Sequence, residues 1–312
     1  MQSFTEAQVV ELLDPAQLVD ALEAAFRDRF PNVVLPDRTH LKTQEGLFLT
    51  MSCYDPPTNS LGTKFISVCE GGTPPVQATY LLFDSRTAKI RASVPAGCLT
   101  EVRTAATSAL ATRYLAREDA STLAIFGTGR EARAHLLVFT CLKNYQSILV
   151  CGRTRAKSES FAAEFSSSLP IRAADAQTCA TNADVVCACT NSRAPLFDGK
   201  LLRPGTHLNL VGSFQPDVRE VDSVAICRAR VYVDTHASAL AEAGDILIPM
   251  GEGLINPAHI ISDLHELVSR KRPGRANSGE ITIFKSVGCA LEDLVAAELV
   301  EQAARKAADQ PR

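Results

Sequence analysis

The stretch Ser121-Thr-Leu-Ala-Ile-Phe126 has the composition of a buried strand, and the glycine turn Gly127-Thr-Gly-Arg-Glu-Ala132 follows it directly. A helical run to Leu142 and a second apolar strand, Ser147 to Cys151, come next. Strand, G-x-G-x-x-A, helix and strand is the order that a dinucleotide-binding unit requires, so this context makes the glycine pattern specific. The alternative is a glycine turn in an α/β fold that binds no nucleotide.

Each small residue of the turn has a physical role in such a unit. Gly127 allows a tight turn, Gly129 lets a pyrophosphate approach the backbone, and Ala132 lets the helix pack closely on the strand. The N-terminus of the helix presents unpaired N–H groups to the anion. The sequence therefore predicts a dinucleotide site at this turn.

The end of the second strand indicates which dinucleotide binds. NAD-binding units usually place Asp or Glu there for the ribose 2′-hydroxyl, whereas Arg accommodates a 2′-phosphate. Here the strand ends Cys151-Gly-Arg-Thr-Arg155, and no carboxylate occurs before Glu159. We expect NADPH, with NADH as a weaker alternative and with Arg153, Thr154 and Arg155 at the 2′-phosphate. The other interpretation is two solvated surface arginines.

Composition excludes several classes of function. The 312 residues are enough for two domains, and 46% hydrophobic with 21% charged residues indicates a sizeable core. The net charge of −3, without a basic run, points to neither nucleic acid nor an anionic membrane. No apolar run reaches membrane length, and the first residues show neither a basic nor an apolar leader region, so we expect no secretion. The ten cysteines lack C-x-x-C spacing and the six histidines form no ligand pattern, so we expect a reducing cytoplasm and no metal.

Before residue 121 the pattern indicates two short helices, an antiparallel meander and a long helix. Ser3-Phe-Thr-Glu6 has capping-box spacing. Asp14-Pro15 marks a second helix with an apolar face that includes Leu18, Leu22 and Phe26. An alanine-rich helix over Gly97–Leu115 follows the strands. A turn at Gly71–Pro75 separates the third and fourth expected strands. The expected strands lie near Val33–Leu41, Leu47–Tyr54, Leu61–Glu70, Gln77–Asp84 and Lys89–Val94.

After the second nucleotide strand, helices and strands continue to alternate. We expect an irregular, glycine-rich segment from Gly244 to Ser278 that becomes helical around Asp263–Arg270, and a last helix over Ala290–Ala308. Further strands are expected at Leu169–Ala173, Ala183–Thr190, His207–Val211, Ala229–Val233 and Ile281–Ser286. The fold class is α/β. A Rossmann-type doubly wound domain (116–289) is inserted in an α+β substrate-binding and dimerisation domain (1–115, completed by 290–312).

Three basic residues of the first domain lie where surface charges are unusual. Lys64 alternates onto the strand face shared by Ile66 and Val68, and Arg103 lies in one helical stripe with Leu99. Arg38 follows an apolar run. Inward-facing cations need partners, so either internal carboxylates satisfy them or one small acidic substrate meets all three. Both possibilities are open from the sequence.

Motifs along nearly the whole chain resemble the ornithine cyclodeaminase/mu-crystallin family. They are Arg103-Thr-Ala-Ala106, Gly127-Thr-Gly129 with Ala132, Pro204-Gly-Thr-His-Leu-Asn209, Val211-Gly212 with Pro216-Asp217, and Phe284-Lys-Ser-Val-Gly288 followed by Glu292-Asp293. The resemblance implies a homodimer formed through the first domains and an active site between domains, with Arg38, Lys64 and Arg103 on the substrate carboxylate. The cofactor-binding set implied by the turn and the resemblance is Thr104, Gly127, Thr128, Gly129, Arg130, Glu131, Arg153, Thr154, Arg155, Thr190, Gly212 and Ser286.

One departure from that family matters. Its cyclodeaminases have a catalytic aspartate shortly after the glycine of the Val211-Gly212 strand, and by the spacing to Pro216 that position falls on Phe214. A phenylalanine cannot act as a general base. Gly212-Ser-Phe214 instead resembles the branch that reduces cyclic ketimines. Glu131, where the family often has glutamine, is a smaller departure.

The resemblance therefore implies NADPH-dependent reduction of pyrroline-2-carboxylate or piperideine-2-carboxylate to proline or pipecolate. Phe214 would contact the ring, and Lys64 is the candidate proton donor, because burial and neighbouring cations lower a lysine pKa. Lys64 could equally act only as a fixed charge. The alternatives are an ornithine cyclodeaminase and a mu-crystallin-like protein that binds a carboxylate ligand without turnover.

Overall fold

The structure is a computed structural model that describes residues 1–69, 71–72 and 76–309. Its internal contacts divide the chain into two units, Met1–Thr107 with Cys289–Arg312, and Ser108–Gly288. The sequence of the second unit thus lies within that of the first. The division falls inside helix α3 (Ala96–Leu115), whereas the sequence placed it after that helix.

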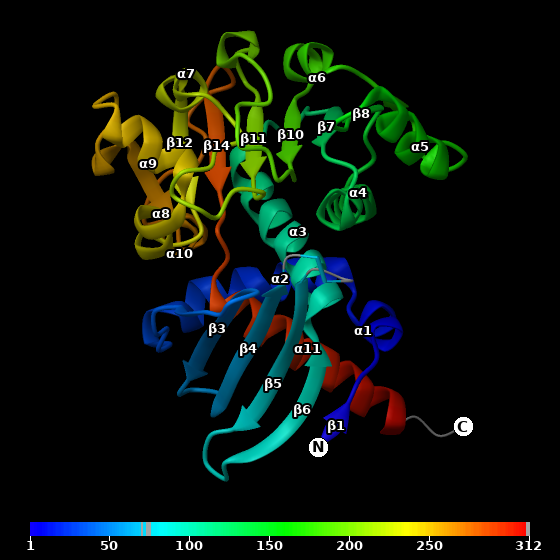
Figure 1. Ribbon diagram of the computed structural model, residues 1–312, viewed down its shortest axis with the longest axis vertical. Helices are drawn as coiled ribbons and strands as arrows, with labels where there is room; N and C mark the ends of the chain where they lie inside the picture. Colours follow the sequence, from blue (N-terminus) through cyan, green and yellow to red (C-terminus); the bar gives the residue numbers. More distant parts are fainter. Residues whose placement is uncertain (70, 73–75, 310–312) are drawn as a thin grey trace. The chain divides into compact units, whose positions relative to one another are not determined.

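The first unit contains a six-stranded sheet in the order β1-β6-β5-β4-β3-β2 (Figure 1). Strands β2 to β6 pair antiparallel, which confirms the expected meander, and β1 pairs parallel with β6. The bounds are β1 Gln2–Ser3, β2 Thr39–Lys42, β3 Gly46–Asp55, β4 Ser60–Cys69, β5 Val76–Asp84 and β6 Lys89–Pro95. Glu70, the expected end of the third strand, and Thr73–Pro75 of the expected turn lie outside the described residues.

Two expectations at the N-terminus were wrong in detail. The expected strand Val33–Leu41 reduces to an isolated bridge between Val34 and Tyr54, followed by β2. Pro36 lies within that span and removes a backbone donor, which disfavours a continuous strand. Ser3 belongs to β1, and the capping box of α1 (Glu6–Leu12) is formed by Thr5 and Gln8 instead.

Helix α11 (Ala290–Asp309) packs on one face of this sheet, against β3, β4 and β5 and against α2 (Pro15–Ala24) (Figure 1). The predicted start of α2 is confirmed, since Asp14 caps the helix and Pro15 is its first residue. Leu18 and Leu22 are fully buried, as their helical spacing predicts. The first core therefore lies between the meander and the last helix of the chain.

The opposite face of the sheet carries no charged side chain in its central register. The pairing places Thr50 beside Phe65 and Thr79, and Tyr54 beside Leu61 and Phe83. Because residues directly opposite one another share a face, this surface consists of Phe48, Thr50, Ser52, Tyr54, Leu61, Thr63, Phe65, Ser67, Gln77, Thr79, Leu81 and Phe83. All of these side chains are half-buried or exposed. We call this set the open sheet face.

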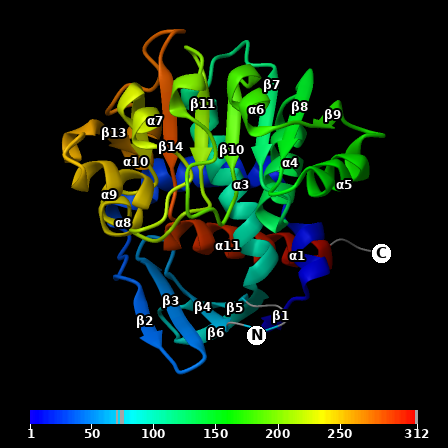
Figure 2. The ribbon, with the colours of Figure 1, turned by 45° about the horizontal axis from the view of Figure 1, so that its top comes forward.

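The second unit is an eight-stranded parallel sheet in the order β13-β12-β14-β11-β10-β7-β8-β9 (Figure 2). Within this sheet the chain forms β7 first and adds β8 and β9 on one side. It then crosses to β10 on the other side of β7, which is the doubly wound topology predicted. The bounds are β7 Thr122–Phe126, β8 Ser147–Cys151, β9 Ile171–Ala173, β10 Val185–Ala188, β11 His207–Leu210, β12 Ala229–Val233, β13 Ile260–Asp263 and β14 Ile281–Lys285.

Several helices of this unit begin at polar caps that the sequence supplies. Thr154 caps α5, Asp175 caps α6 and Asp222 caps α7 through side-chain oxygens that accept backbone N–H bonds. The helices are α4 Arg130–Leu142, α5 Arg155–Phe165, α6 Ala176–Asn182, α7 Ser223–Arg228, α8 His236–Glu242, α9 Gly244–Gly251 and α10 Leu264–Val268. The expectation of an irregular segment after Gly244 was wrong there, because α9 begins at that residue and β13 follows.

Candidate functional site

A cleft of about 890 Å³ opens at the carboxyl ends of β7, β8 and β10, where the strand order reverses. Doubly wound sheets bind ligands at this point because the loops diverge there. The cleft brings together five of the predicted cofactor residues: Gly127, Thr128, Gly129, Arg153 and Thr190. Lys157, Asn191, Ser192 and Arg193 also line it and were not predicted.

The glycine turn fits a pyrophosphate. Gly127 has φ +113°, and a Cβ there would lie 2.5 Å from the Cys189 carbonyl oxygen, so only glycine is tolerated. Gly129 is the N-cap of α4, and a Cβ added to it would project into open space. The N-cap of α4, a 13-residue helix, makes no side-chain hydrogen bond to the first turn, so the N–H groups there have no capping side chain. The pyrophosphate role expected for both glycines stays a prediction.

The cations after β8 divide into two pairs. Arg153 and Lys157 line the large cleft, whereas Arg155 and Arg172 line an adjacent cavity of about 460 Å³. The two spaces share Cys151, Gly152 and Ala176. Arg155 forms an ion pair of 2.7 Å with Glu159, and its side chain is 89% exposed. Arg153 is therefore the arginine of the motif best placed for a ligand in the large cleft.

Three predicted cofactor residues of the second unit hold the backbone around the strand ends. Thr154 accepts the N–H of Lys157 at 3.3 Å as the cap of α5. Ser286 donates to the buried Asp234 carboxylate at 3.1 Å. The Gly212 N–H donates to the Glu220 carboxylate at 2.8 Å. The remaining two, Arg130 and Glu131, form the first turn of α4.

In the first unit, two predicted cations converge on one carboxylate. Lys64 Nζ lies 2.9 Å and 2.8 Å from the two carboxylate oxygens of Asp293, and Arg103 Nε lies 3.0 Å from Oδ1. Arg103 also contacts Glu292 at 2.6 Å. All four side chains are buried, as alternation and helical spacing predicted for the two cations. Asp293 and Glu292 occupy the first turn of α11, where the helix dipole favours negative charge.

The internal pairing that the sequence left open is thus present, and it shifts two pKa values. Burial is the largest effect on Lys64 and lowers its pKa to about 8, although the Asp293 charge opposes that shift. The charges of Arg103 and Arg38 lower it further. Burial disfavours an ionised Asp293, but the neighbouring Arg103 and Lys64 outweigh burial and hold its pKa below the usual value.

The other three predicted site residues, Arg38, Thr104 and Phe214, differ in burial and in their contacts. Arg38 is half-buried, and its charge acts on Lys64. Thr104 is buried in the first unit, where its hydroxyl donates to the Thr100 carbonyl at 2.7 Å. Phe214 follows β11 in the second unit, and 52% of it is exposed.

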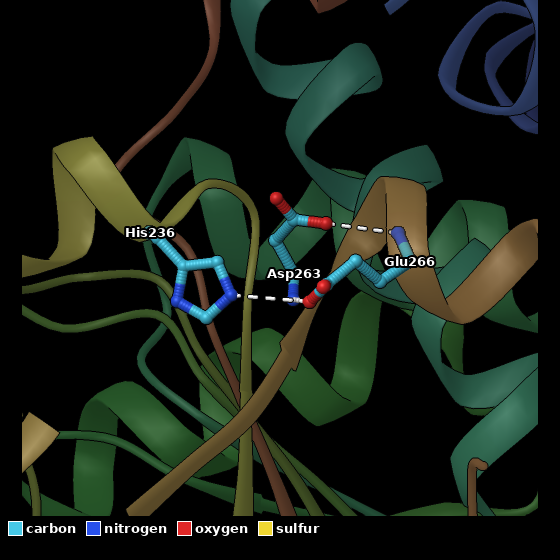
Figure 3. A group of neighbouring side chains, drawn as sticks. All are labelled: His236, Asp263 and Glu266. Atoms are coloured by element: carbon cyan, nitrogen blue, oxygen red, sulfur yellow. Dashed lines mark hydrogen bonds and ion pairs between the residues drawn. The ribbon is translucent and has the colours of Figure 1, made fainter. Parts of the chain in front are cut away.

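His236, Asp263 and Glu266 form a small polar group in the second unit (Figure 3). One ligand atom from each lies within 4.8 Å of the others. Asp263 and Glu266 form the capping box of α10, and His236 Nε2 lies 3.1 Å from Glu266 Oε2. Helix capping and this ion pair account for the arrangement, so we assign it to the fold.

Sequence reasoning missed the partners of the cations. Asp293 was part of a recognised motif, but its contact with Lys64 spans 229 positions, and no local pattern reports such a separation. Lys157 is three residues after the cap Thr154, a position that helical geometry returns toward the helix start.

Among the described residues, no helix has the length and hydropathy needed to cross a membrane.

Comparisons with known proteins agree with this geometry. The chain is 34% identical to the ketimine reductase mu-crystallin of Rattus norvegicus over 310 residues, which cover 96% of each protein. It is 37% identical to a Delta(1)-pyrroline-2-carboxylate reductase of Colwellia psychrerythraea over 235 residues, 73% of each. The structure matches that of Thermococcus litoralis Delta(1)-pyrroline-2-carboxylate reductase in complex with NADH and L-proline, with a TM-score of 0.94 and 32% identity, over 99% of this chain and 98% of that one.

A family model also matches residues 2–308. The match includes the cluster around Asp293 as well as the glycine turn, so it extends over both units. The chain belongs to the ornithine cyclodeaminase/mu-crystallin family.

Proposed function

We propose that this protein reduces a small cyclic ketimine carboxylate, pyrroline-2-carboxylate or piperideine-2-carboxylate, to L-proline or L-pipecolate with NADPH. The observation that carries the proposal is the buried set Lys64, Arg103 and Asp293 in a chain that also has a cleft at its glycine turn. Relatives named as ketimine and pyrroline-2-carboxylate reductases support it, as does a similar structure that contains NADH and L-proline.

The dinucleotide would bind through the second unit. The N–H groups of the first turn of α4 suit the pyrophosphate, and Thr128, Arg153 and Thr190 line the remaining cleft. A nicotinamide cofactor supplies the hydride for reduction of a C=N bond. The preference for NADPH rests on Arg153 and Lys157 in the cleft and on the absence of a carboxylate from Gly152 to Ser158.

The charges of the first unit suit an anionic substrate. Lys64, Arg103 and Arg38 provide three positive charges, and Asp293 and Glu292 provide two negative ones. Asp293 holds both Lys64 and Arg103 in fixed positions, so their orientation needs little reorganisation when an anion binds.

Lys64 is the proposed proton donor. Reduction adds a hydride to the carbon that bears the carboxylate, and the ring nitrogen must carry a proton when it does. An amine with a pKa of about 8 is mostly protonated at neutral pH and releases its proton more readily than an ordinary lysine. Asp293 would then stabilise Lys64 in its charged form each time it is reprotonated.

The experiment is NADPH oxidation, followed by absorbance, with each cyclic imine and with ornithine alone. Net oxidation with an imine supports the reductase. Formation of proline from ornithine without net change in cofactor would indicate the cyclodeaminase instead, and it would require a base other than Phe214. Tight ligand binding without turnover of either substrate would indicate a binding protein of the mu-crystallin kind.

We also propose a homodimer formed through the open sheet face. Its twelve uncharged side chains, with Phe48 and Phe65 rings 6.2 Å apart, present an apolar and hydroxyl-rich surface to solvent in the single chain. An uncharged, partly exposed sheet face is a suitable surface for a two-fold interface. A reducing compartment such as the cytoplasm is the expected setting for its ten free cysteines.

A further inference from the structure

A buried carboxylate in the second unit joins two loops at the strand ends. Glu220 is fully buried, and its Oε1 accepts both the Thr190 N–H at 2.8 Å and the Thr190 hydroxyl at 2.7 Å. Its Oε2 accepts the Gly212 N–H at 2.8 Å. Thr190 follows β10 and Gly212 follows β11, so one side chain connects loops from two neighbouring strands.

The same loops approach too closely for any side chain between them. A Cβ on Gly212 would lie 1.9 Å from the Thr190 carbonyl oxygen. Glycine at this position therefore permits the contact, and Glu220 sets its geometry through three hydrogen bonds to its carboxylate.

Two further buried charged residues, Asp245 and Lys285, connect Glu220 to Ser213, which lies in the same loop as Gly212. Asp245 Oδ1 accepts the Glu220 N–H at 2.7 Å and the Val221 N–H at 3.1 Å, and its Oδ2 lies 3.0 Å from Lys285 Nζ. Lys285 donates to the Ser213 carbonyl at 2.5 Å. The bonds thus form a closed circuit from Gly212 through Glu220, Asp245 and Lys285 to Ser213.

Three fully buried charges are a costly way to hold a fold, since apolar side chains of similar volume often stabilise as well or better. The circuit is best explained by what it fixes. Thr190 lines the dinucleotide cleft, and Phe214, next to Ser213, is the exposed aromatic residue of the turn. We infer that Glu220 is a positioning residue, which holds the Thr190 wall of the cleft and the Gly212–Phe214 turn in one fixed arrangement for imine reduction. This inference rests on the proposed function for its kinetic consequence only.

The variant Glu220→Gln should keep the contact of residue 220 with Thr190 and remove its contact with Gly212. Glutamine has the same size but one carbonyl oxygen, and the two donors of Thr190 compete for it against one donor of Gly212. The amide NH₂ then faces the Gly212 N–H, that bond is lost, and the turn is released. We expect kcat/KM for the imine to fall about ten-fold or more, while the NADPH Kd, measured by calorimetry, changes by less than about two-fold. An equal loss for imine and NADPH would overturn the inference.

A readout independent of activity keeps this test separate from the proposed function. Hydrogen exchange in Glu220→Gln should rise in peptides that cover 212–218 and stay unchanged in those that cover 190–196. If the wild type reduces neither imine, the proposed function fails, but this exchange pattern still supports the positioning role. Unchanged exchange at 212–218 would overturn it.

Two further variants complete the design. Asp217→Asn removes an exposed carboxylate from the same loop and should leave kinetics and exchange as in the wild type. Thr190→Val removes one of the three bonds to Glu220 and should raise exchange at 212–218 less than Glu220→Gln does, so it carries the test if Glu220→Gln does not fold. An exchange pattern for Thr190→Val identical to the wild type would count against the circuit.

Discussion

Lys64 reaches both carboxylate oxygens of Asp293, at 2.9 Å and 2.8 Å, from a strand in the middle of the meander to the first turn of the last helix. Both side chains of the pair are buried, and Arg103 contacts the same carboxylate at 3.0 Å. Such an arrangement costs desolvation energy and is stable only while each partner remains. It therefore makes the chemistry of Lys64 dependent on Asp293.

Replacing Lys64 by Met tests the proton-donor role. The protonated amine is the active form, so the wild-type imine reduction rate should be constant at neutral pH and fall as the pH rises through about 8. We expect Lys64→Met to lower kcat by about two orders of magnitude or more and to abolish that alkaline decline. The measurement is kcat against pH at saturating NADPH.

Lys89→Met is the matched control, because Lys89 is an exposed lysine of the same sheet and should keep the wild-type profile. Retention of the alkaline decline in Lys64→Met would assign the titration to another group. The fixed-charge role would then be the remaining one for Lys64.

Asp293→Asn should both destabilise the protein and shift the titration of Lys64. Loss of one partner from a buried ion pair costs about 3–5 kcal/mol, so the melting temperature should fall clearly. Because Asp293 raises the Lys64 pKa, its loss should move the alkaline decline to lower pH. The Asp293 pKa is depressed below 3.8, so its contribution is present above that pH and is lost as pH falls through the depressed value.

Asp309→Asn, at the exposed end of the same helix, provides the comparison and should change neither quantity. Calorimetric melting at neutral pH and the pH–rate profile are the two measurements. An Asp293→Asn protein with wild-type stability would show that the pair contributes little to folding.

Arg153→Ala tests the cofactor preference. Loss of one charge-assisted contact to a 2′-phosphate corresponds to about 1.5–3 kcal/mol, so NADPH binding should weaken by about one to two orders of magnitude, with NADH barely affected. Arg155→Ala should have a smaller effect, because Arg155 is paired with Glu159 and largely exposed. Calorimetric titration with both cofactors makes the comparison. Equal losses for NADPH and NADH in Arg153→Ala would refute the 2′-phosphate assignment.

Features that depend on nearby residues in the sequence were predictable, whereas those that depend on distant residues were not. The glycine turn was predictable because Gly127 and Gly129 act through backbone geometry within a few residues. The inward position of Lys64 followed from period-two alternation. The strand β13 was missed because four residues, half of them polar, give no periodic signal.

The circuit around Glu220 could not be predicted for a different reason. It joins residues 190, 212, 245 and 285, which the parallel sheet brings to one edge only after folding. Buried ion pairs of this kind depend on tertiary contacts, and their members look like ordinary charged residues in the sequence. Family resemblance identified Gly212 and the segment around Lys285 but not what they contact.

Phe65→Glu tests the dimer. Phe65 lies near the middle of the open sheet face and is 36% exposed in the single chain. A charge there would be buried in the proposed interface without a partner, so we expect dissociation to monomers in sedimentation experiments. Leu142→Glu replaces an apolar residue of similar exposure, 37%, in the second unit and should leave the assembly state unchanged. A wild-type protein that sediments as a monomer would exclude the proposed interface.

Phe214 distinguishes the reductase from the cyclodeaminase. If the missing aspartate removed the second activity, the wild type should reduce pyrroline-2-carboxylate and convert no ornithine to proline. Phe214→Asp should lower imine reduction, because a charge replaces an apolar surface beside an anionic substrate, and it should allow traces of cyclodeamination. Phe214→Leu keeps an apolar surface and should retain most of the imine reduction. Since Phe214 is 52% exposed, both variants should fold with nearly wild-type stability. Ornithine turnover by the unmodified protein at a rate comparable to imine reduction would remove the role assigned to Phe214 and leave that of Lys64, Arg103 and Asp293 intact.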